Sequence, residues 1–378
     1  EIMRLTFKEL KDEVQKIVPK DIPYTVELEA GNIALVTPEP NRILATEGLL
    51  AKISHKVKRK IVLRPDPSIM KSEEDATKIV REIIPESAVI NQIYFDACYR
   101  EITVQCDNPG EAVGRRGINL EQIRDQSGWL ISVERTSPLI SKTVHDIRGY
   151  RHAHAEERRK LLKDFGLNMH RPVRPGATWA RVTALGSYRE VGRACHFVTT
   201  NESRVMIDVG VNIASDTDPM PYFTAPEALP LEKLDAVVLT HAHLDHAGML
   251  PVLFKYGYRG PVYCTPPTRD LMLLLQTDYL KVGGSEGKRA PYSMEDIRTC
   301  MKHVVDVDWD ETTDIAPDIK LTFSNAGHIL GSSAVHLHIG DGKHNIVFSG
   351  DQKYEKSWLF DAANTRFPRV ETLVIEST

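Results

Sequence analysis

The chain has 378 residues, enough for two or three domains, and its 42% hydrophobic and 26% charged residues are typical of a soluble globular protein. The formal net charge of −4 excludes an overall basic field, so a nucleic-acid surface can only be a local patch. The five cysteines form no C-x-x-C pair and the apolar runs are too short for a bilayer, so we expect a cytoplasmic protein without a disulfide scaffold, a zinc ribbon or a membrane segment.

Residues 1–140 contain a repeat of about 70 residues. In the first copy, alternating apolar residues predict strands at 24–28 and 32–37. A helical pattern covers 44–57, and a closing strand is expected at 60–63. The second copy is shifted by about 69 residues and is the clearer of the two. It comprises a strand at 100–106, a turn at 108–110, a Gly-Arg-Arg-Gly loop at 114–117, a helix that Gly128 ends, and a strand at 129–133.

The second copy resembles the KH fold, because a helix, a GxxG loop and a helix lie between strands. The resemblance implies that Gly114, Arg115, Arg116 and Gly117 bind single-stranded RNA. In such a loop the glycines let the backbone approach phosphates, and the arginines add positive charge. The alternative is a glycine-bounded helix entry with exposed arginines.

The first copy departs from this pattern at the same loop, which consists of residues 45–48. Ala45 replaces the first glycine, and Glu47 places an acid where the second copy has arginine. We therefore expect a KH-like shape with a poor phosphate loop. The basic run at 56–60 leaves two interpretations open, an RNA contact and a solvated helix end.

Residues 141–178 form a polar bridge. We expect it to connect two KH-like domains, 1–68 and 69–140, to a third domain at 179–378. The stretch 150–165 predicts an exposed basic helix, and Pro175 with Gly176 indicates a domain boundary. Four histidines in the bridge lack a strand-end context, so we interpret them as surface residues: His145, His152, His154 and His170.

From Trp179 onward, groups of strands alternate with helices, which favours a layered sandwich. The predicted strands cover 181–185, 194–199, 204–207, 236–239, 262–264, 320–323, 334–339, 345–348 and 372–375. The predicted helices cover 248–256, 268–281 and 293–300. His336 and His338 alternate on one of these strands, apart from any motif, and we interpret them as structural.

Three histidines and an aspartate follow the strand at 236–239 within six residues: His241, His243, Asp245 and His246. Imidazole nitrogen with carboxylate oxygen is a ligand set that suits zinc. His241 and His243 are two residues apart, so they can project to one side of an extended segment and bind one ion. Asp245 and His246 could bind a second. The alternative is a surface loop rich in histidine.

This H-x-H-x-D-H motif resembles the central motif of the metallo-β-lactamase superfamily. Three further motifs follow the superfamily order, a strand that ends at Asp208, a loop with His328, and a strand followed by Asp351. The resemblance implies an α+β chain in which two tandem KH-like domains precede an αββα metallo-β-lactamase domain. It also implies two Zn²⁺ ions. His241, His243 and His328 would hold the first, Asp245 and His246 the second, and Asp351 both, with Asp208 orienting the histidine loop.

The segment 373–378, with Glu376, resembles the opening acidic motif of the β-CASP group of nucleic-acid-processing enzymes. There the acid pairs with a histidine that acts as general acid on the leaving oxygen. Asp208, Asp245 and Glu376 are therefore our candidate catalytic residues. The two later histidine motifs of the group have no match before Thr378, so we expect a domain cut at the start of β-CASP and catalytically incomplete as written. A generic acid at a strand end is the alternative for Glu376.

KH modules ahead of such a nuclease resemble the archaeal homologues of the cleavage and polyadenylation specificity factor nuclease. The resemblance implies a homodimeric endoribonuclease that cuts RNA near transcript 3′ ends, with transcription termination as its setting and RNA polymerase or other transcription machinery as possible partners. Two other functions remain open, a non-enzymatic RNA-binding termination factor and a small-molecule hydrolase of the same fold. The arginines of the GxxG loop and Glu376 argue against the small-molecule hydrolase.

Overall fold

The computed structural model describes residues 5–139, 141–172, 179–215, 217–285, 291–340 and 342–377. The chain divides into two compact units, and the division falls between Gly166 and Leu167. This position lies inside helix α8 (Ala155–Met169), within the bridge expected from the sequence. The boundary predicted at Pro175 and Gly176 lies outside the described residues.

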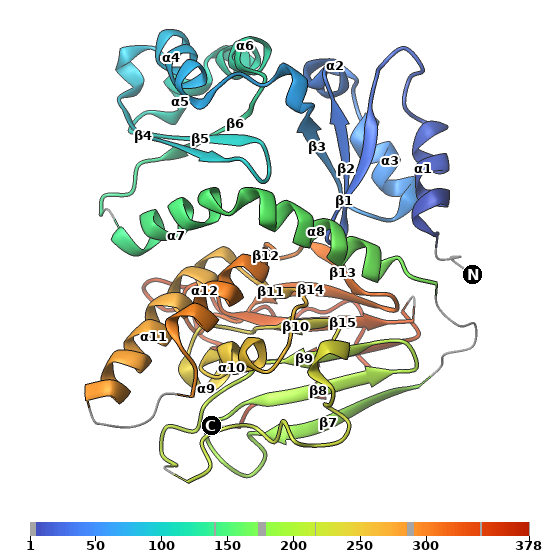
Figure 1. Cartoon of the computed structure of the whole chain (residues 1–378), viewed down its shortest axis with the longest axis vertical. Coiled ribbons are helices and arrows are strands. Elements are labelled where there is room, and N and C mark those ends of the chain that lie inside the picture. The colour runs from blue at the N-terminus through green and yellow to red at the C-terminus, as the bar shows by residue number, and fades with distance from the viewer. Residues whose placement is uncertain are drawn as a thin grey trace. The chain divides into compact units, whose positions relative to one another are not determined.

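The first unit holds two three-stranded sheets of the same design (Figure 1). In each sheet the first two strands pair antiparallel, and the third pairs parallel with the second. The strands are β1 (Thr25–Glu29), β2 (Asn32–Thr37), β3 (Ile61–Pro65), β4 (Ile90–Asp96), β5 (Glu101–Cys106) and β6 (Leu130–Arg135). The helices are α1 (Phe7–Gln15), α2 (Pro40–Ala45), α3 (Leu49–Val57), α4 (Glu73–Ile83), α5 (Pro109–Val113), α6 (Ile118–Ser127) and α7 (Lys142–Ala153), followed by α8.

The offset between the two copies is 69 residues, because the central strands begin at Asn32 and Glu101. The same offset separates Gly48 from Gly117, the residues that precede the last helix of each copy. Both glycines are left-handed, with φ of 68° and 78°. This conformation is costly for other residues, which explains why glycine is retained at this position of the degenerate first copy.

Each copy buries its own apolar side chains. In the first, Ile33 and Leu35 alternate along β2 and pack with Ile53 of α3. In the second, Ile102 and Val104 occupy the equivalent places on β5. A strand buries alternate residues and a helix buries every third or fourth, so these two periodicities produce one helix-on-sheet core in each copy.

A buried arginine joins the two sheets of this unit. Arg64 of β3 forms hydrogen-bonded ion pairs with Glu29 at 2.8 and 2.9 Å, and with Glu101 of the second sheet at 2.6 Å. Its guanidinium carbon lies 4.9 Å from the centre of the Tyr99 ring. A second contact joins two helices of the two copies, because Nε of Arg124 in α6 donates to the Asn41 side chain of α2 at 2.7 Å. Two separate polar contacts therefore fix one copy against the other.

Three local predictions in this unit were wrong. The predicted helix 44–57 is two helices, because the left-handed Gly48 interrupts it. The predicted turn at 108–110 is the start of α5, where Pro109 occupies the first helical position. The predicted exposed helix 150–165 is divided between α7 and α8, and it is not exposed throughout. Arg158 is only 1% exposed, with its guanidinium carbon 5.5 Å from the Tyr99 ring centre. An aromatic face can accept a guanidinium, so a basic run need not be solvated.

The second unit contains a six-stranded and a five-stranded sheet, whose strand orders are β12-β11-β10-β9-β8-β7 and β13-β14-β15-β16-β17. The first comprises β7 (Ala180–Gly186), β8 (Cys195–Thr200), β9 (Arg204–Ile207), β10 (Ala236–Val238), β11 (Val262–Cys264) and β12 (Val304–Asp306). The second comprises β13 (Thr312–Ala316), β14 (Ile319–Asn325), β15 (Ser333–Ile339), β16 (His344–Phe348) and β17 (Thr372–Val374). All nine predicted strands are present, whereas β12 and β13 were missed.

Four helices precede the second sheet in the chain: α9 (Leu244–Ala247), α10 (Leu250–Lys255), α11 (Pro266–Ser285) and α12 (Met294–His303). Within residues 291–340 and 342–377, α12 is the last helix. Strands β9 and β10 run parallel, and β14 and β16 both run antiparallel to β15. The carboxyl ends of each such pair therefore meet at one sheet edge. Across the described residues, no helix is both long and apolar enough to cross a membrane.

Candidate metal centre

All six predicted ligands converge at the carboxyl ends of these strands. His241 and His243 lie in the loop after β10, and Asp245 and His246 lie on the short helix α9 that follows. His328 follows β14, and Asp351 follows β16. Their ligand atoms form two groups, each with all atoms within 4.8 Å of one another. The groups are His241, His243, His328 and Asp351, and Asp245, His246 and Asp351.

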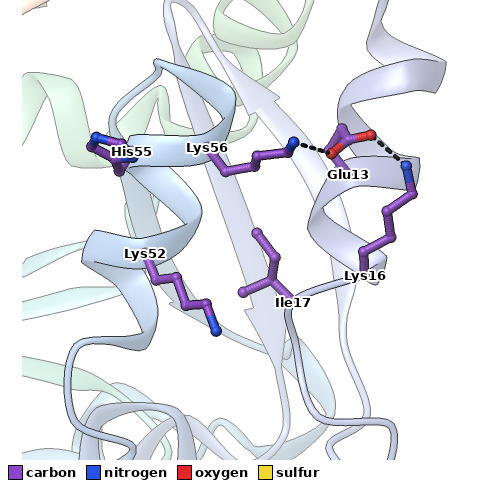
Figure 2. A pocket seen from close by; sticks show the side chains of 6 residues that line it. All are labelled: Glu13, Lys16, Ile17, Lys52, His55 and Lys56. Atoms are coloured by element: carbon purple, nitrogen blue, oxygen red, sulfur yellow. Dashed lines mark hydrogen bonds and ion pairs between the residues drawn. The ribbon is translucent and has the colours of Figure 1, made fainter.

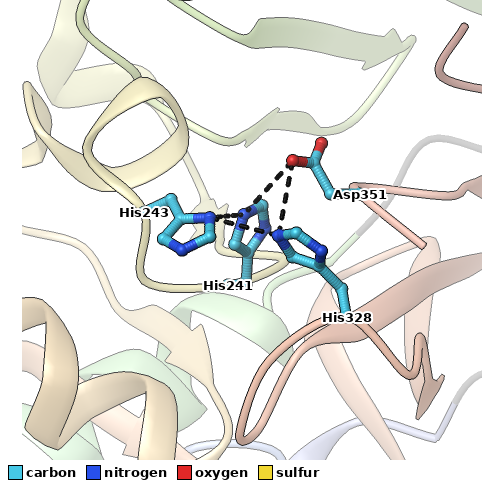
Figure 3. Close-up of side chains that lie close together, drawn as sticks. All are labelled: His241, His243, His328 and Asp351. Carbon is cyan, nitrogen blue, oxygen red and sulfur yellow. Dashed lines mark hydrogen bonds and ion pairs between the residues drawn. The ribbon is translucent and has the colours of Figure 1, made fainter. Parts of the chain in front are cut away.

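The first group has the dimensions of a tetrahedral zinc site (Figure 3). The Nδ1 atom of His243 lies 3.1 Å from Nε2 of His241 and 3.2 Å from Nε2 of His328. Oδ2 of Asp351 lies 3.8 and 3.6 Å from the same two Nε2 atoms. With metal–ligand bonds of about 2.0–2.1 Å, neighbouring ligand atoms of a tetrahedron are about 3.3 Å apart. The side chains therefore fit one ion of this size.

The second group uses the other oxygen of the same carboxylate. Oδ1 of Asp351 lies 3.1 Å from Nε2 of His246, which is 3.9 Å from Oδ2 of Asp245. Asp351 thus directs one oxygen to each group, so a single carboxylate belongs to both.

Asp208 lies beneath the histidine loop and does not face either group. Its side chain is 1% exposed and accepts hydrogen bonds from the Thr240 N–H and hydroxyl, and from Nδ1 of His246, each at 2.8 Å. Its φ of 60° is unusual for a residue other than glycine, and such backbone strain is concentrated at functional sites. These contacts agree with the expected task of orienting the histidine loop, and the place of Asp208 among the candidate catalytic residues stays a prediction.

These contacts also select the imidazole tautomers. The Thr240 hydroxyl donates to Asp208, so its oxygen is free to accept from Nδ1 of His241 at 3.0 Å. Nδ1 of His246 donates to Asp208 directly. When either ring is neutral, its proton is therefore on Nδ1, and its Nε2 atom presents a lone pair to its ligand group.

The protonation of the site depends on burial and on the two aspartates. Burial lowers the pKa of His241 well below its ordinary value, and the neighbouring imidazoles lower it further. Burial also lowers the pKa of His243. At His246 burial acts in the same direction, but Asp208 and Asp351 outweigh it and raise the pKa to about 10. Neutral imidazole is the form that binds a metal, so an ion in the second group must displace a proton from His246.

Several hydroxyl groups that support the ligands were not predicted. Ser332 Oγ accepts the His328 N–H at 3.1 Å and thereby orders the loop of this ligand. Thr265 and Thr268, at the start of α11, donate to the Gly331 carbonyl of the same loop at 2.8 and 3.1 Å. Neither apolar periodicity nor ligand spacing marks such residues. The only available signal for Thr240 was a hydroxyl at the end of a buried strand.

The predicted Glu376 lies beside the Asp351 loop. Its Oε1 accepts the N–H of Gln352 at 2.8 Å, and its own N–H donates to Ser349 Oγ at 3.1 Å. These bonds hold the two residues that flank Gly350 and Asp351.

In the first unit, Arg115 and Arg116 are exposed at the loop between α5 and α6, and Arg116 has a φ of 53°. The loop therefore presents both charged side chains to solvent.

The second unit matches a family model described as the metallo-beta-lactamase superfamily, over residues 188–377, about half of the chain. The chain belongs to the metallo-β-lactamase superfamily. This fold implies a bound divalent metal, for which the His and Asp cluster provides the ligands. A second model, described as the KH domain of transcription termination factor FttA, matches residues 4–70. The predicted order, KH fold and then metallo-β-lactamase fold, is thereby confirmed.

Curated relatives align with nearly the whole chain, and each is named transcription termination factor FttA. The protein of Methanosarcina mazei is 47% identical over 371 residues, which cover 98% of this chain and 58% of that protein. The protein of Methanothermobacter thermautotrophicus is 42% identical over 377 residues, 98% of this chain and 59% of its own length. That of Methanocaldococcus jannaschii is 44% identical over 371 residues, with 98% and 58% covered. The chain thus spans less than two thirds of these superfamily members.

Proposed function

We propose that this superfamily member is a zinc-dependent endoribonuclease that hydrolyses RNA phosphodiester bonds in 3′-end processing and transcription termination. The observation that carries the proposal is the geometry of Asp351, whose two oxygens face two separate groups of ligand atoms. Two metals held by these groups would suit phosphodiester hydrolysis, because they would stabilise both the attacking and the leaving oxygen.

The residues of each group have distinct tasks in this proposal. His241, His243 and His328 would hold one zinc ion with Asp351, and Asp245 and His246 would hold the other with the same carboxylate. Ions bound there would act as Lewis acids on the scissile phosphate and lower the pKa of water to about 7. Asp351 fixes the separation of the two groups, and Asp208 keeps the lone pair of His246 directed at the second. We include Glu376, which holds the backbone beside Asp351, as the partner of a histidine that would act as general acid, as the family resemblance implies.

RNA as the substrate is supported by the first unit and by the relatives. The loop 114–117 exposes Arg115 and Arg116 between two helices of a KH fold, where cations can contact backbone phosphates. The name of the relatives, transcription termination factor, supports a role in transcription termination. We include RNA polymerase as a possible partner, as the family resemblance implies. We include homodimer formation in the proposal, as the family resemblance implies.

A second candidate is a termination factor that binds RNA without cutting it, which the name of the relatives also supports. The complete set of metal ligands favours the enzyme, because a relic site has no need to keep six ligands in register. A small-molecule hydrolase of the same fold leaves the exposed arginines of the GxxG loop without a role.

The test uses the complete gene product and a labelled single-stranded RNA. We expect internal cleavage that stops when a chelator removes the metal and resumes on addition of zinc. The variant Asp351→Ala should bind the RNA as tightly as wild type and should not cut it. Cleavage that survives both chelation and this substitution would exclude the mechanism. RNA binding without any cleavage by the wild type would favour the termination factor.

A further inference from the structure

A basic hollow lies in the first KH copy, between α1 and α3 (Figure 2). Its volume is about 460 Å³, and it is lined by Glu13, Lys16, Ile17, Lys52, His55 and Lys56. We name it the α1–α3 hollow. Figure 2 shows the Lys52 and Lys56 side chains extending from α3 towards α1. The α1–α3 hollow is lined by no residue of the metal centre and by no residue of the GxxG loop of the second copy.

The α1–α3 hollow carries a net positive charge. Three lysines face one carboxylate, that of Glu13, so the sum is +2 with His55 neutral. Lys16 Nζ lies 2.5 Å from one oxygen of Glu13, and Lys56 Nζ lies 3.3 Å from the other. The side chains of Lys16 and Lys56 are nevertheless 66% and 59% exposed, so each ammonium can reach a ligand in solvent. Glu13, at 18%, is the less accessible partner.

The two α3 lysines of the hollow follow the degenerate loop of this copy closely in the chain. The Lys52 N–H donates to the Gly48 carbonyl at 2.8 Å, so this lysine stands in the first turn after the loop. Lys56 follows four residues later, on the same face of α3. In the loop itself Glu47 is exposed and repels phosphate. The second copy therefore carries its positive charge in the loop, whereas the first copy carries it on the helix α3 that follows the loop.

We propose that the α1–α3 hollow binds backbone phosphates of the RNA strand, as a substitute for the impaired GxxG loop of the first copy. This inference rests on the RNA binding that the proposed function includes. Phosphate suits the hollow because its cations are lysines, which act as mobile point charges, and because Ile17 is its only apolar side chain. No Phe, Tyr or Trp side chain lines it, and His55 is its one ring, so the contact is with the backbone and is independent of RNA sequence.

Substitutions of opposite expected effect test the proposal. The pair K52A/K56A removes two cations, and Glu13→Gln removes the carboxylate that competes with phosphate for Lys16 and Lys56. Binding of a labelled uridine oligonucleotide is followed by fluorescence anisotropy at several salt concentrations. K52A/K56A should weaken binding about threefold to tenfold, as for the loss of two exposed ion pairs, and should reduce the salt slope by about 1. Glu13→Gln should strengthen binding about twofold to fivefold.

The gain expected for Glu13→Gln cannot result from misfolding, which would weaken binding. The control K281A/K343A removes two exposed lysines from the second unit, with the same change in net charge, and should bind as wild type does. Unchanged or weaker binding by Glu13→Gln, with an unchanged slope for K52A/K56A, overturns the inference. If R115A/R116A then still weakens binding, the RNA role of the protein survives. A wild type that binds no RNA overturns both.

Discussion

The substitution Asp208→Asn isolates the charge of one buried carboxylate from its shape. Asparagine has the same size and tolerates the left-handed φ of 60° that Asp208 adopts. Its oxygen can still accept the Thr240 N–H. Its amide nitrogen, however, must face Nδ1 of His246, which now accepts and no longer donates. The proton of the neutral ring then moves to Nε2, the atom that lies 3.1 Å from Asp351.

The expected magnitude follows from this change of tautomer. Replacing the partner that orients a ligating histidine typically lowers metal affinity about 10- to 100-fold, or about 1.4–2.7 kcal/mol. The loss should fall on the group that contains His246 and Asp245. Among the hydrogen bonds described, the group that contains His241, His243 and His328 contacts Asp208 only indirectly, through the Thr240 hydroxyl that accepts from Nδ1 of His241. It should therefore lose less affinity, by about threefold or roughly 0.6 kcal/mol.

The assay is a zinc titration against a chromogenic chelator, which resolves two affinities when the two groups differ. Asp318→Asn is a matched control, since Asp318 is also buried and accepts a hydrogen bond from Ser203, away from the metal centre. The control should lose stability and keep both zinc affinities. Equal losses at the two groups in Asp208→Asn, or no loss at either, would refute the reasoning about His246.

Three further predictions address the bridge, the RNA loop and the joint between the KH copies. Asp351→Ala should lower zinc binding at both groups, to at most one ion per chain by elemental analysis, because each loses a ligand. R115A/R116A should weaken RNA binding and lower the salt slope of the affinity by about 1, and an unchanged slope would place the RNA surface elsewhere. Arg64→Met should cost about 3–5 kcal/mol in urea unfolding because it leaves two glutamates without their buried partner, whereas Arg42→Ala, with exposed pairs only, should leave the unfolding midpoint nearly unchanged.

The metal centre could be predicted from the sequence because its residues follow strands. The apolar run at 236–239 predicts a buried strand. The end of such a strand places His241 and His243 at a sheet edge, whatever the conformation of the loop. The order of the motifs then brought in His328 and Asp351, which are distant in the chain. That Asp351 contributes to both groups was implied by resemblance alone. The distances from its two oxygens to His246 and His328 now support it.

What could not be predicted depends on contacts between segments that are far apart. The apolar spacing of 44–57 continues through the break at Gly48, because both helices bury the same face against one sheet. Arg158 has the sequence context of a solvated residue, and only the position of Tyr99 in space explains its burial. Strand β12 begins at Val304, directly after α12 ends at His303, so no turn residue separates the two patterns in the sequence.

The ion pairs of Arg64 have a consequence for how a long ligand is held. Since Glu29 and Glu101 belong to different sheets and share one buried guanidinium, the two KH copies cannot rotate freely about a linker. An RNA strand that binds both KH copies must therefore span a distance that the protein fixes. No entropy is lost in bringing two tethered modules together. The two KH copies would then favour RNA that is long enough to reach from one copy to the other.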